Sequence, residues 1–135
     1  KHNYHPKTRE ELKELVKKLI SERGNNADLN DIDTSKITNM SDLFVFNEFN
    51  GDISLWNVSN VTDMTRMFYE CKNFNCDLSE WDVSKVKYMN QMFKYCENFD
   101  SDLSNWKPYN AENISIMFGW NPIIQGLFIL LLQLI

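Results

Sequence analysis

One segment of the chain recurs 25 residues later with the same order of apolar and polar side chains. The segment is VSNVTDMTRMF at 58–68, and it returns as VSKVKYMNQMF at 83–93. Self-similarity at a fixed period of about 20 to 50 residues is typical of proteins built from small units stacked on copies of themselves. Because one such unit cannot bury a core alone, the chain is expected to present an extended surface.

Four repeats are predicted, each opened by an aspartate. Their ranges are 28–51, 52–76, 77–101 and 102–125. Residues 1–27 are expected to form an N-terminal capping helix ahead of the repeats, and residues 126–135 an apolar tail after them. The expected organisation is therefore a single repeat domain with a cap at its start.

The apolar spacing inside the third repeat predicts a strand followed by a short helix. The first apolar residues of this repeat approach an alternating pattern, which is typical of a short strand; they are Leu78, Trp81 and Val83. The next apolar residues are three and four positions apart, which is typical of a helix; they are Met89, Met92, Phe93 and Cys96. The predicted fold class is α/β: a solenoid with one short parallel strand and one short helix in each repeat.

The repeat resembles the leucine-rich repeats of the BspA-like bacterial surface proteins. Leu78, Trp81 and Val83 match the strand leucines of that unit, and the pair Met92-Phe93 matches its Ala-Phe pair. The W-[DN]-V-S-x-V-x-x-M-x-x-M-F form is more similar still to a sub-family found in surface lipoproteins and uncharacterised proteins of mycoplasmas. The resemblance implies a leucine-rich-repeat-like solenoid and exposure outside the cell, and it implies no catalytic residue.

Residues 8–24 predict a helix with both ends marked. Thr8 and Glu11 form a capping box at the start, and Gly24 ends the helix. The apolar side chains fall on one face; they are Leu12, Leu15, Val16, Leu19 and Ile20. The mixed charges of the other face favour a cap for the first repeat over a membrane-binding helix.

The charge distribution argues against nucleic acid as a partner. The net charge is −5, and residues 25–135 hold seven basic against fifteen acidic side chains. Such a surface offers no basic patch for phosphates.

The tail GLFILLLQLI at 126–135 is apolar but shorter than the roughly 20 residues that span a bilayer. Three interpretations stay open for it: a cap or truncated repeat, a frameshifted segment, or a weak anchor to a membrane or partner.

The chain contains few residues in patterns suited to catalysis, and an enzyme is not expected. The histidines, His2 and His5, precede the first helix, and no nucleophile elbow, phosphate loop or paired-histidine motif occurs. No cofactor or metal is predicted. The aspartates that open the repeats could hold calcium, but an Asx-turn at each is favoured; they are Asp28, Asp52, Asp77 and Asp102.

The three cysteines are neither a disulfide framework nor a metal set. Cys71 and Cys96 share one repeat position and are predicted to be buried free thiols. Cys76 falls in a predicted turn, where its thiol would be reactive.

Ligand binding is predicted at positions that point outward from the predicted strands. These residues are Asp31, Asp33, Leu55, Asn57, Glu80, Asp82, Asn105 and Lys107. The inner strand face of leucine-rich repeats is their usual binding surface; the alternative is a merely solvated face.

The predicted function is a non-catalytic protein–protein interaction module of a bacterial surface or secreted protein, with an unknown protein partner. One alternative is a structural spacer or stalk that binds no ligand. Another is a carbohydrate-directed adhesin, which is disfavoured because the exposed aromatic residues form no evident platform in the sequence.

Overall fold

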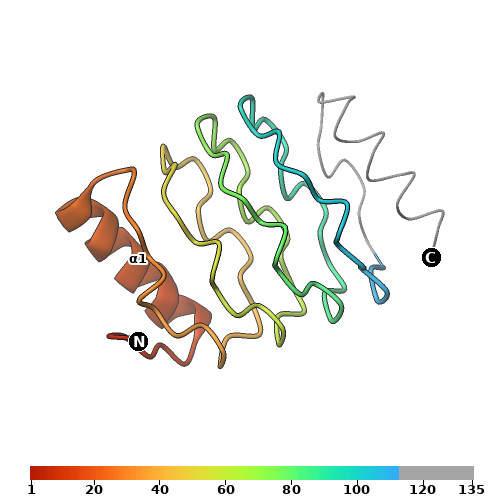
Figure 1. The fold of residues 1–135 in the computed structure, drawn as a ribbon, viewed down its shortest axis with the longest axis horizontal. Coiled ribbons are helices and arrows are strands. Elements are labelled where there is room, and N and C mark those ends of the chain that lie inside the picture. Colours follow the sequence, from red (N-terminus) through yellow and green to blue (C-terminus); the bar gives the residue numbers. More distant parts are fainter. Residues whose placement is uncertain (113–135) are drawn as a thin grey trace.

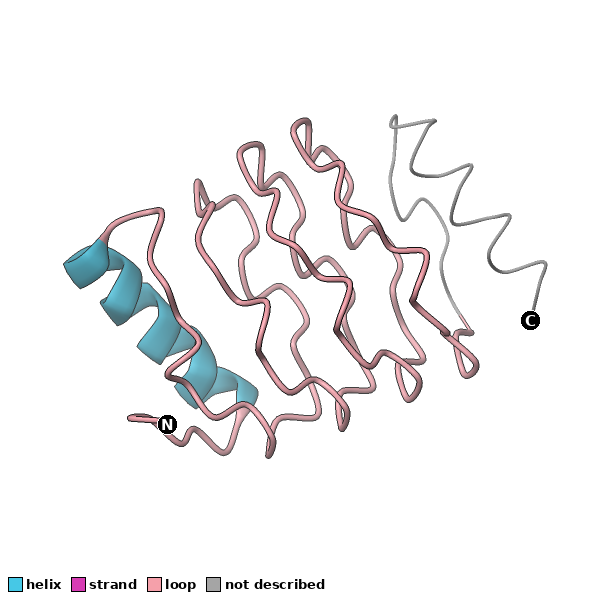
Figure 2. Cartoon of the chain, in the orientation of Figure 1, coloured by secondary structure: helices cyan, strands magenta, loops and turns pink. Residues whose placement is uncertain are grey.

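The computed structural model describes residues 1–112, in which one helix precedes a stack of coils (Figure 1). The helix, α1, spans Arg9–Arg23. Each repeat winds once around as a flattened coil, and successive coils lie side by side (Figures 1 and 2). Parallel β-bridges join residues 24 or 25 apart, such as Asp28 with Asp52 and Asp63 with Tyr88. The last part of the fourth repeat and the predicted tail at 126–135 lie outside the described residues.

The predicted α/β solenoid, with a parallel strand and a helix in each repeat, is wrong. Among residues 1–112, adjacent coils pair through isolated β-bridges and form no strands, and α1 is the only helix. In the first limb of the second coil (52–62) the backbone turns on itself instead of extending. The amide of Trp56 donates to the carbonyl of Ile53 at 3.1 Å, and that of Val61 to Val58 at 2.9 Å. These turns use the donors that a strand would offer to its neighbour.

Consecutive tight turns replace the predicted helix in the second limb (63–71 in the second coil). Arg66 and Glu70 have φ angles of 55° and 57°, which a right-handed helix does not allow. Alternate amides bond to the next coil, as from Phe68 to the carbonyl of Met92 at 3.0 Å. Turns of this length bury residues three and four apart, as a helix would. The spacing therefore identified the buried positions correctly and the backbone wrongly.

Equivalent side chains stack through the core from coil to coil. The rings of Phe44 and Phe68, and those of Phe68 and Phe93, lie 5.5 Å apart and nearly parallel. Each core tryptophan donates its indole N–H to a carbonyl of the preceding coil at 2.8 to 3.1 Å. The tryptophans and methionines at equivalent positions form two core ladders, whose members are all at most 4% exposed; they are Trp56, Trp81 and Trp106, and Met40, Met64 and Met89.

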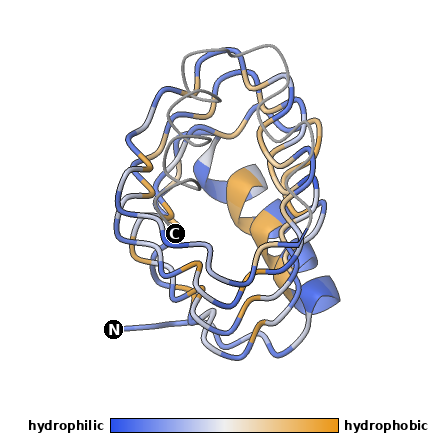
Figure 3. Cartoon of the chain, turned by 90° about the vertical axis from the view of Figure 1, so that its right-hand side faces the viewer, coloured by the Kyte–Doolittle hydropathy of each residue, from blue (hydrophilic) through white to orange (hydrophobic). Residues whose placement is uncertain are grey.

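Helix α1 lies across the start of the stack. Its predicted ends are confirmed: the Thr8 hydroxyl accepts from the Glu11 amide at 3.1 Å, and Gly24 follows the last turn with a φ of 93°. The buried face joins the same apolar cluster as the coils; its residues are Leu12, Val16 and Leu19. Viewed along the stack, the coils superimpose and the apolar face of α1 lies behind them (Figure 3).

An N-terminal arm, residues 1–7, lies beside the first coil as an additional layer. The amide of Asn3 donates to the carbonyl of Asp31, and the amide of Asp33 donates to the carbonyl of Tyr4, both at 2.8 Å. Tyr4 and Ile32 form a parallel bridge. The arm therefore satisfies backbone groups of the first coil that have no preceding coil to pair with.

Two of the cysteines are buried free thiols, as predicted. The thiol of Cys71 donates to the carbonyl of Phe44 at 2.8 Å, and that of Cys96 to Phe68 at 2.7 Å. Burial raises the pKa of Cys71 to about 12. Each thiol is thus one more bond between adjacent coils, and neither is a reactive thiolate at neutral pH.

Candidate functional site

The predicted ligand-binding residues form two rows that cross the first limbs of the coils. We call Asp31, Leu55, Glu80 and Asn105 the outer row, and Asp33, Asn57, Asp82 and Lys107 the turn row. Residues of one row come from equivalent positions in successive repeats. The coils lie side by side (Figure 1), so equivalent positions of successive repeats follow one another across the stack.

Three members of the turn row shape the backbone. The side-chain oxygens of Asp33, Asn57 and Asp82 each accept a hydrogen bond from the amide two residues later, at 3.0 Å. This is the Asx-turn that the sequence predicts only for the aspartates opening the repeats. These three residues are therefore needed for the fold, and a charge reversal at Asp82 would open a turn as well as change the surface.

The predicted Asx-turns at the repeat openings are confirmed. Each aspartate accepts from the amide two residues on, at 2.8 or 2.9 Å; these aspartates are Asp28, Asp52, Asp77 and Asp102. Both sets of aspartates thus hold backbone amides, and a metal ion is not required to explain their recurrence. Among residues 1–112, no three His, Cys, Asp or Glu side chains are grouped so that they could hold a metal ion.

The first-coil members of the two rows are occupied by the N-terminal segment. The Asp31 carboxylate accepts hydrogen bonds from both terminal nitrogens of Arg23, at 2.9 and 3.0 Å, and from the side-chain amide of Asn3 at 3.0 Å. Asp33 lies 3.3 Å from the ring nitrogen Nδ1 of His5. These carboxylates fasten α1 and the arm to the stack, so they are not free to bind a partner.

Acid is expected to destabilise the protein from about pH 4 downward. The Arg23 guanidinium lowers the pKa of Asp31 to about 2, and the Ser35 hydroxyl and amide lower that of Asp33 to about 2. Both pKa values are lower than in the unfolded chain, so this stability is complete above the unfolded pKa. It is lost as the pH falls through the folded pKa. Denaturant midpoints measured from about pH 5 to pH 2 should follow this decline.

The variant Asp31→Asn tests which group is responsible for part of that decline. It should lose about 1 kcal/mol at neutral pH, a value reduced for the partial exposure of the ion pair, and its stability should depend less on pH. A variant with the same pH profile as the parent would contradict the assignment to Asp31.

A shallow hollow of about 440 Å³ brings together four predicted residues of the third and fourth coils. They are Glu80, Asp82, Asn105 and Lys107. Within residues 1–112, no hydrogen bond or ion pair holds the side chains of Glu80, Asn105 or Lys107. Leu55 continues the outer row in the second coil and is 74% exposed. The structure therefore groups the later members of the predicted site and separates the earlier ones from it.

Tyr109 also lines this hollow and was missed by sequence reasoning. Its side chain is 59% exposed. The sequence did contain a signal, because the three earlier repeats have serine at this position: Ser35, Ser59 and Ser84. A tyrosine that replaces a recurring serine marks a departure from the repeat.

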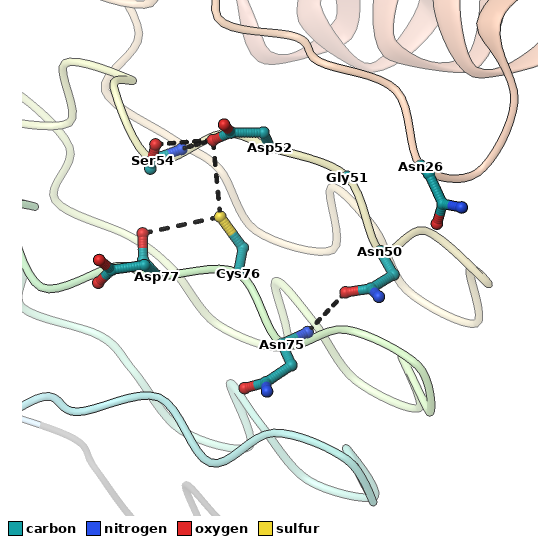
Figure 4. Close-up of a pocket in the computed structure, with 8 residues that line it drawn as sticks. All are labelled: Asn26, Asn50, Gly51, Asp52, Ser54, Asn75, Cys76 and Asp77. Carbon is teal, nitrogen blue, oxygen red and sulfur yellow. Dashed lines mark hydrogen bonds between the residues drawn. The ribbon is translucent and has the colours of Figure 1, made fainter.

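A second hollow, of about 380 Å³, lies along the repeat openings (Figure 4). Asp52 and Asp77 line it with several asparagines, and both carboxylates are held by their Asx-turns. The Cys76 thiol lies between them, 4.0 Å from the Asp52 carboxylate and 3.7 Å from the Asp77 carbonyl. The predicted reactivity of Cys76 is wrong: the thiol is buried, and burial raises its pKa to about 11.

Comparison with known proteins extends this description. The sequence profile of a family described as "Mycoplasma protein of unknown function, DUF285" matches residues 11–125. The predicted similarity to a mycoplasma-type repeat is thereby confirmed, whereas the BspA-like leucine-rich-repeat assignment is not supported. No curated protein and no solved structure gave a match. Among the described residues, none of the helical structure is long and apolar enough to cross a bilayer.

Proposed function

We propose, for a chain that belongs to the DUF285 family of Mycoplasma proteins of unknown function, that it is a non-catalytic protein-binding module of a surface or secreted protein. The proposed binding surface combines the hollow of the third and fourth coils with Leu55 of the second. It excludes Asp31 and Asp33, whose carboxylates are bound within the chain.

One observation supports this proposal above the others: the outer row varies while the frame beneath it repeats. Successive coils carry leucine, glutamate and asparagine at this position, at Leu55, Glu80 and Asn105. The residues that follow in the core are tryptophan each time. A constant frame with varied exposed side chains lets a repeat protein recognise one partner among many. An exposed leucine among polar neighbours suits the apolar centre of such an interface.

A charge exchange tests the proposal without changing the net charge. The double variant Glu80→Lys, Lys107→Glu should lose capture of a surface-protein partner, because rim and core charges of an interface select the partner. Its melting curve should match the parent, since within residues 1–112 neither side chain has a partner. Capture is measured by pull-down with the whole chain, followed by titration of the purified partner.

The matched control is the double variant Lys72→Glu, Glu97→Lys, which exchanges two exposed charges away from the hollow. It should bind as the parent does. If the Glu80 and Lys107 exchange leaves capture intact, the proposed surface is wrong. If the parent captures no partner that the exchange removes, a spacer without a ligand of its own is the better description.

A further inference from the structure

The N-terminal arm is bound to the first coil in the way that an extended peptide is bound to the edge of a sheet. The carbonyl of Asp31 accepts the amides of Asn3 and Tyr4, at 2.8 and 3.3 Å. The amide of Asp33 donates to the carbonyl of Tyr4 at 2.8 Å, and Tyr4 and Ile32 form a parallel bridge. Main-chain bonds of this kind hold an added segment, while side chains decide which segment fits. We call residues 31–33, with their backbone and carboxylates, the first-coil edge.

The side chains of the arm alternate between the carboxylates of this edge and the core. The side-chain amide of Asn3 donates to the Asp31 carboxylate at 3.0 Å. A ring nitrogen of His5 lies 3.3 Å from the Asp33 carboxylate. Tyr4, between these two residues, is partly buried and packs against the apolar cluster. The edge therefore suits a segment in which an aromatic residue is flanked on both sides by side chains that carry N–H groups.

The contacts at the edge carboxylates are exposed, so the arm can be displaced. Exposed pairs such as those of Asn3 and His5 contribute little to stability. Arg23 holds the Asp31 carboxylate independently of the arm, so α1 and the first coil keep a connection of their own. The chain runs directly from the arm into α1. Such a short tether gives the arm an effective concentration on the order of millimolar, which keeps it bound even at low intrinsic affinity.

We propose that the first-coil edge is a binding site for an extended peptide segment of another protein, and that the N-terminal arm is its displaceable intramolecular ligand. The arm closes the edge until a segment with the same alternation and a higher affinity takes its place. The pKa values of Asp31 and Asp33 are about 2, so both carboxylates are ionised at neutral pH. A basic side chain in the place of His5 should therefore make a charge-assisted bond and bind more tightly.

The experiment first releases the arm within the whole chain. The double variant Asn3→Asp, His5→Asp places carboxylates opposite those of the edge, and like charges repel the arm. Hydrogen exchange of the Asp33 amide, followed by NMR, should become at least about tenfold faster, because the Tyr4 carbonyl no longer accepts from it. The melting curve should stay close to that of the parent, since the altered contacts are exposed.

The arm sequence is then offered back as a free peptide with blocked ends. The peptide KHNYHP, which copies residues 1–6, should bind the released variant at about millimolar concentration and slow the exchange of the Asp33 amide again. The parent, whose own arm competes, should bind the peptide at least about tenfold more weakly. The same peptide with His5→Arg should bind the variant more tightly, and the peptide with His5→Glu should not bind.

The matched control is Lys17→Asp, on the exposed face of α1. It changes the net charge by the same amount as the double variant, with His5 counted as neutral, but places no carboxylate at the first-coil edge. The control should keep the slow Asp33 exchange of the parent and bind the peptide as weakly as the parent does.

The proposal is overturned if the peptide does not slow the Asp33 exchange of the released variant at millimolar concentration. It is also overturned if parent and variant bind the peptide equally, because the peptide then binds elsewhere, or if the His5→Glu peptide binds as well as the His5→Arg peptide. A double variant that loses cooperative melting, or that keeps the Asp33 amide protected, shows that the arm is a fixed part of the fold and overturns the proposal too.

The first-coil edge is separate from the hollow of the third and fourth coils, and its peptide binding goes beyond the proposed function without depending on it. The exchange of Glu80 and Lys107 alters only the hollow. Its effect on protein capture therefore bears on the proposed function, whereas exchange of the Asp33 amide and binding of the arm peptide bear on the edge.

Discussion

Replacing Trp81 with alanine is expected to lower the free energy of unfolding by about 3 to 5 kcal/mol. The side chain is 3% exposed, and its ring lies 6.3 Å from that of Phe68 in the adjacent coil. Its indole N–H donates to the Ile53 carbonyl at 3.1 Å, so the variant also removes one of the two hydrogen bonds that this carbonyl accepts, the other coming from the Trp56 amide. The change should appear as a lower denaturant midpoint, followed by the fluorescence of the remaining tryptophans.

Two control variants identify the source of that loss. Trp81→Phe removes the hydrogen bond and keeps most of the apolar surface, so it should cost less than Trp81→Ala. Leu55→Ala removes an exposed apolar side chain from the next coil and should change stability by no more than about 0.5 kcal/mol. If Trp81→Ala unfolds at the same midpoint as the parent, the indole is not part of the cooperative core.

Replacing Leu19 of α1 with aspartate is expected to abolish cooperative unfolding or to cause aggregation. Leu19 is fully buried in the cluster that joins α1 to the coils. A carboxylate placed there has no partner, and its burial would cost several kcal/mol. Domains are stable by only about 5 to 15 kcal/mol, so α1 would detach and expose the apolar end of the stack. Size-exclusion chromatography and thermal melting measure the two outcomes.

The matched control is Lys17→Asp, on the exposed face of the same helix. It introduces the same carboxylate at nearly the same point of the chain and should leave a monomer that melts close to the parent. A Leu19→Asp variant that stays monomeric and melts unchanged would show that α1 does not cover the stack. In that case α1 would be a helix free to bind a partner or a membrane.

The pattern of apolar residues was sufficient to predict which side chains are buried. The burial of the apolar positions of the third repeat, such as Trp81 and Met89, was predicted correctly, as were the free thiols of Cys71 and Cys96 and both ends of α1. These features depend on burial or on contacts within about four residues of the chain, and the periodicity of a sequence reports both. The family resemblance to mycoplasma repeats followed from the same positions.

The backbone of the repeats could not be predicted in this way. Spacings of three and four residues are shared by a helix and by consecutive turns, since both bring such residues to one face. The two structures differ in the acceptors of their backbone amides: a helix bonds its amides within the same segment, whereas alternate amides here donate to carbonyls of the next coil. The Asx-turns at Asn57 and Asp82 also disfavour a strand, because their side-chain oxygens accept from amides that a strand ladder would need.

The same distinction between local pattern and distant contacts applies to the candidate surfaces. The sequence by itself determined that the outer-row positions Leu55, Glu80 and Asn105 are exposed, since each precedes a core tryptophan. Only the tertiary structure decided that Asp31 and Asp33 are bound by the N-terminal segment, and that the rings of Phe46, Tyr69 and Tyr95 meet edge to face. The physical reason is that exposure follows from the local pattern, whereas these neighbours are contacts between residues far apart in the chain, which only the folded structure brings together.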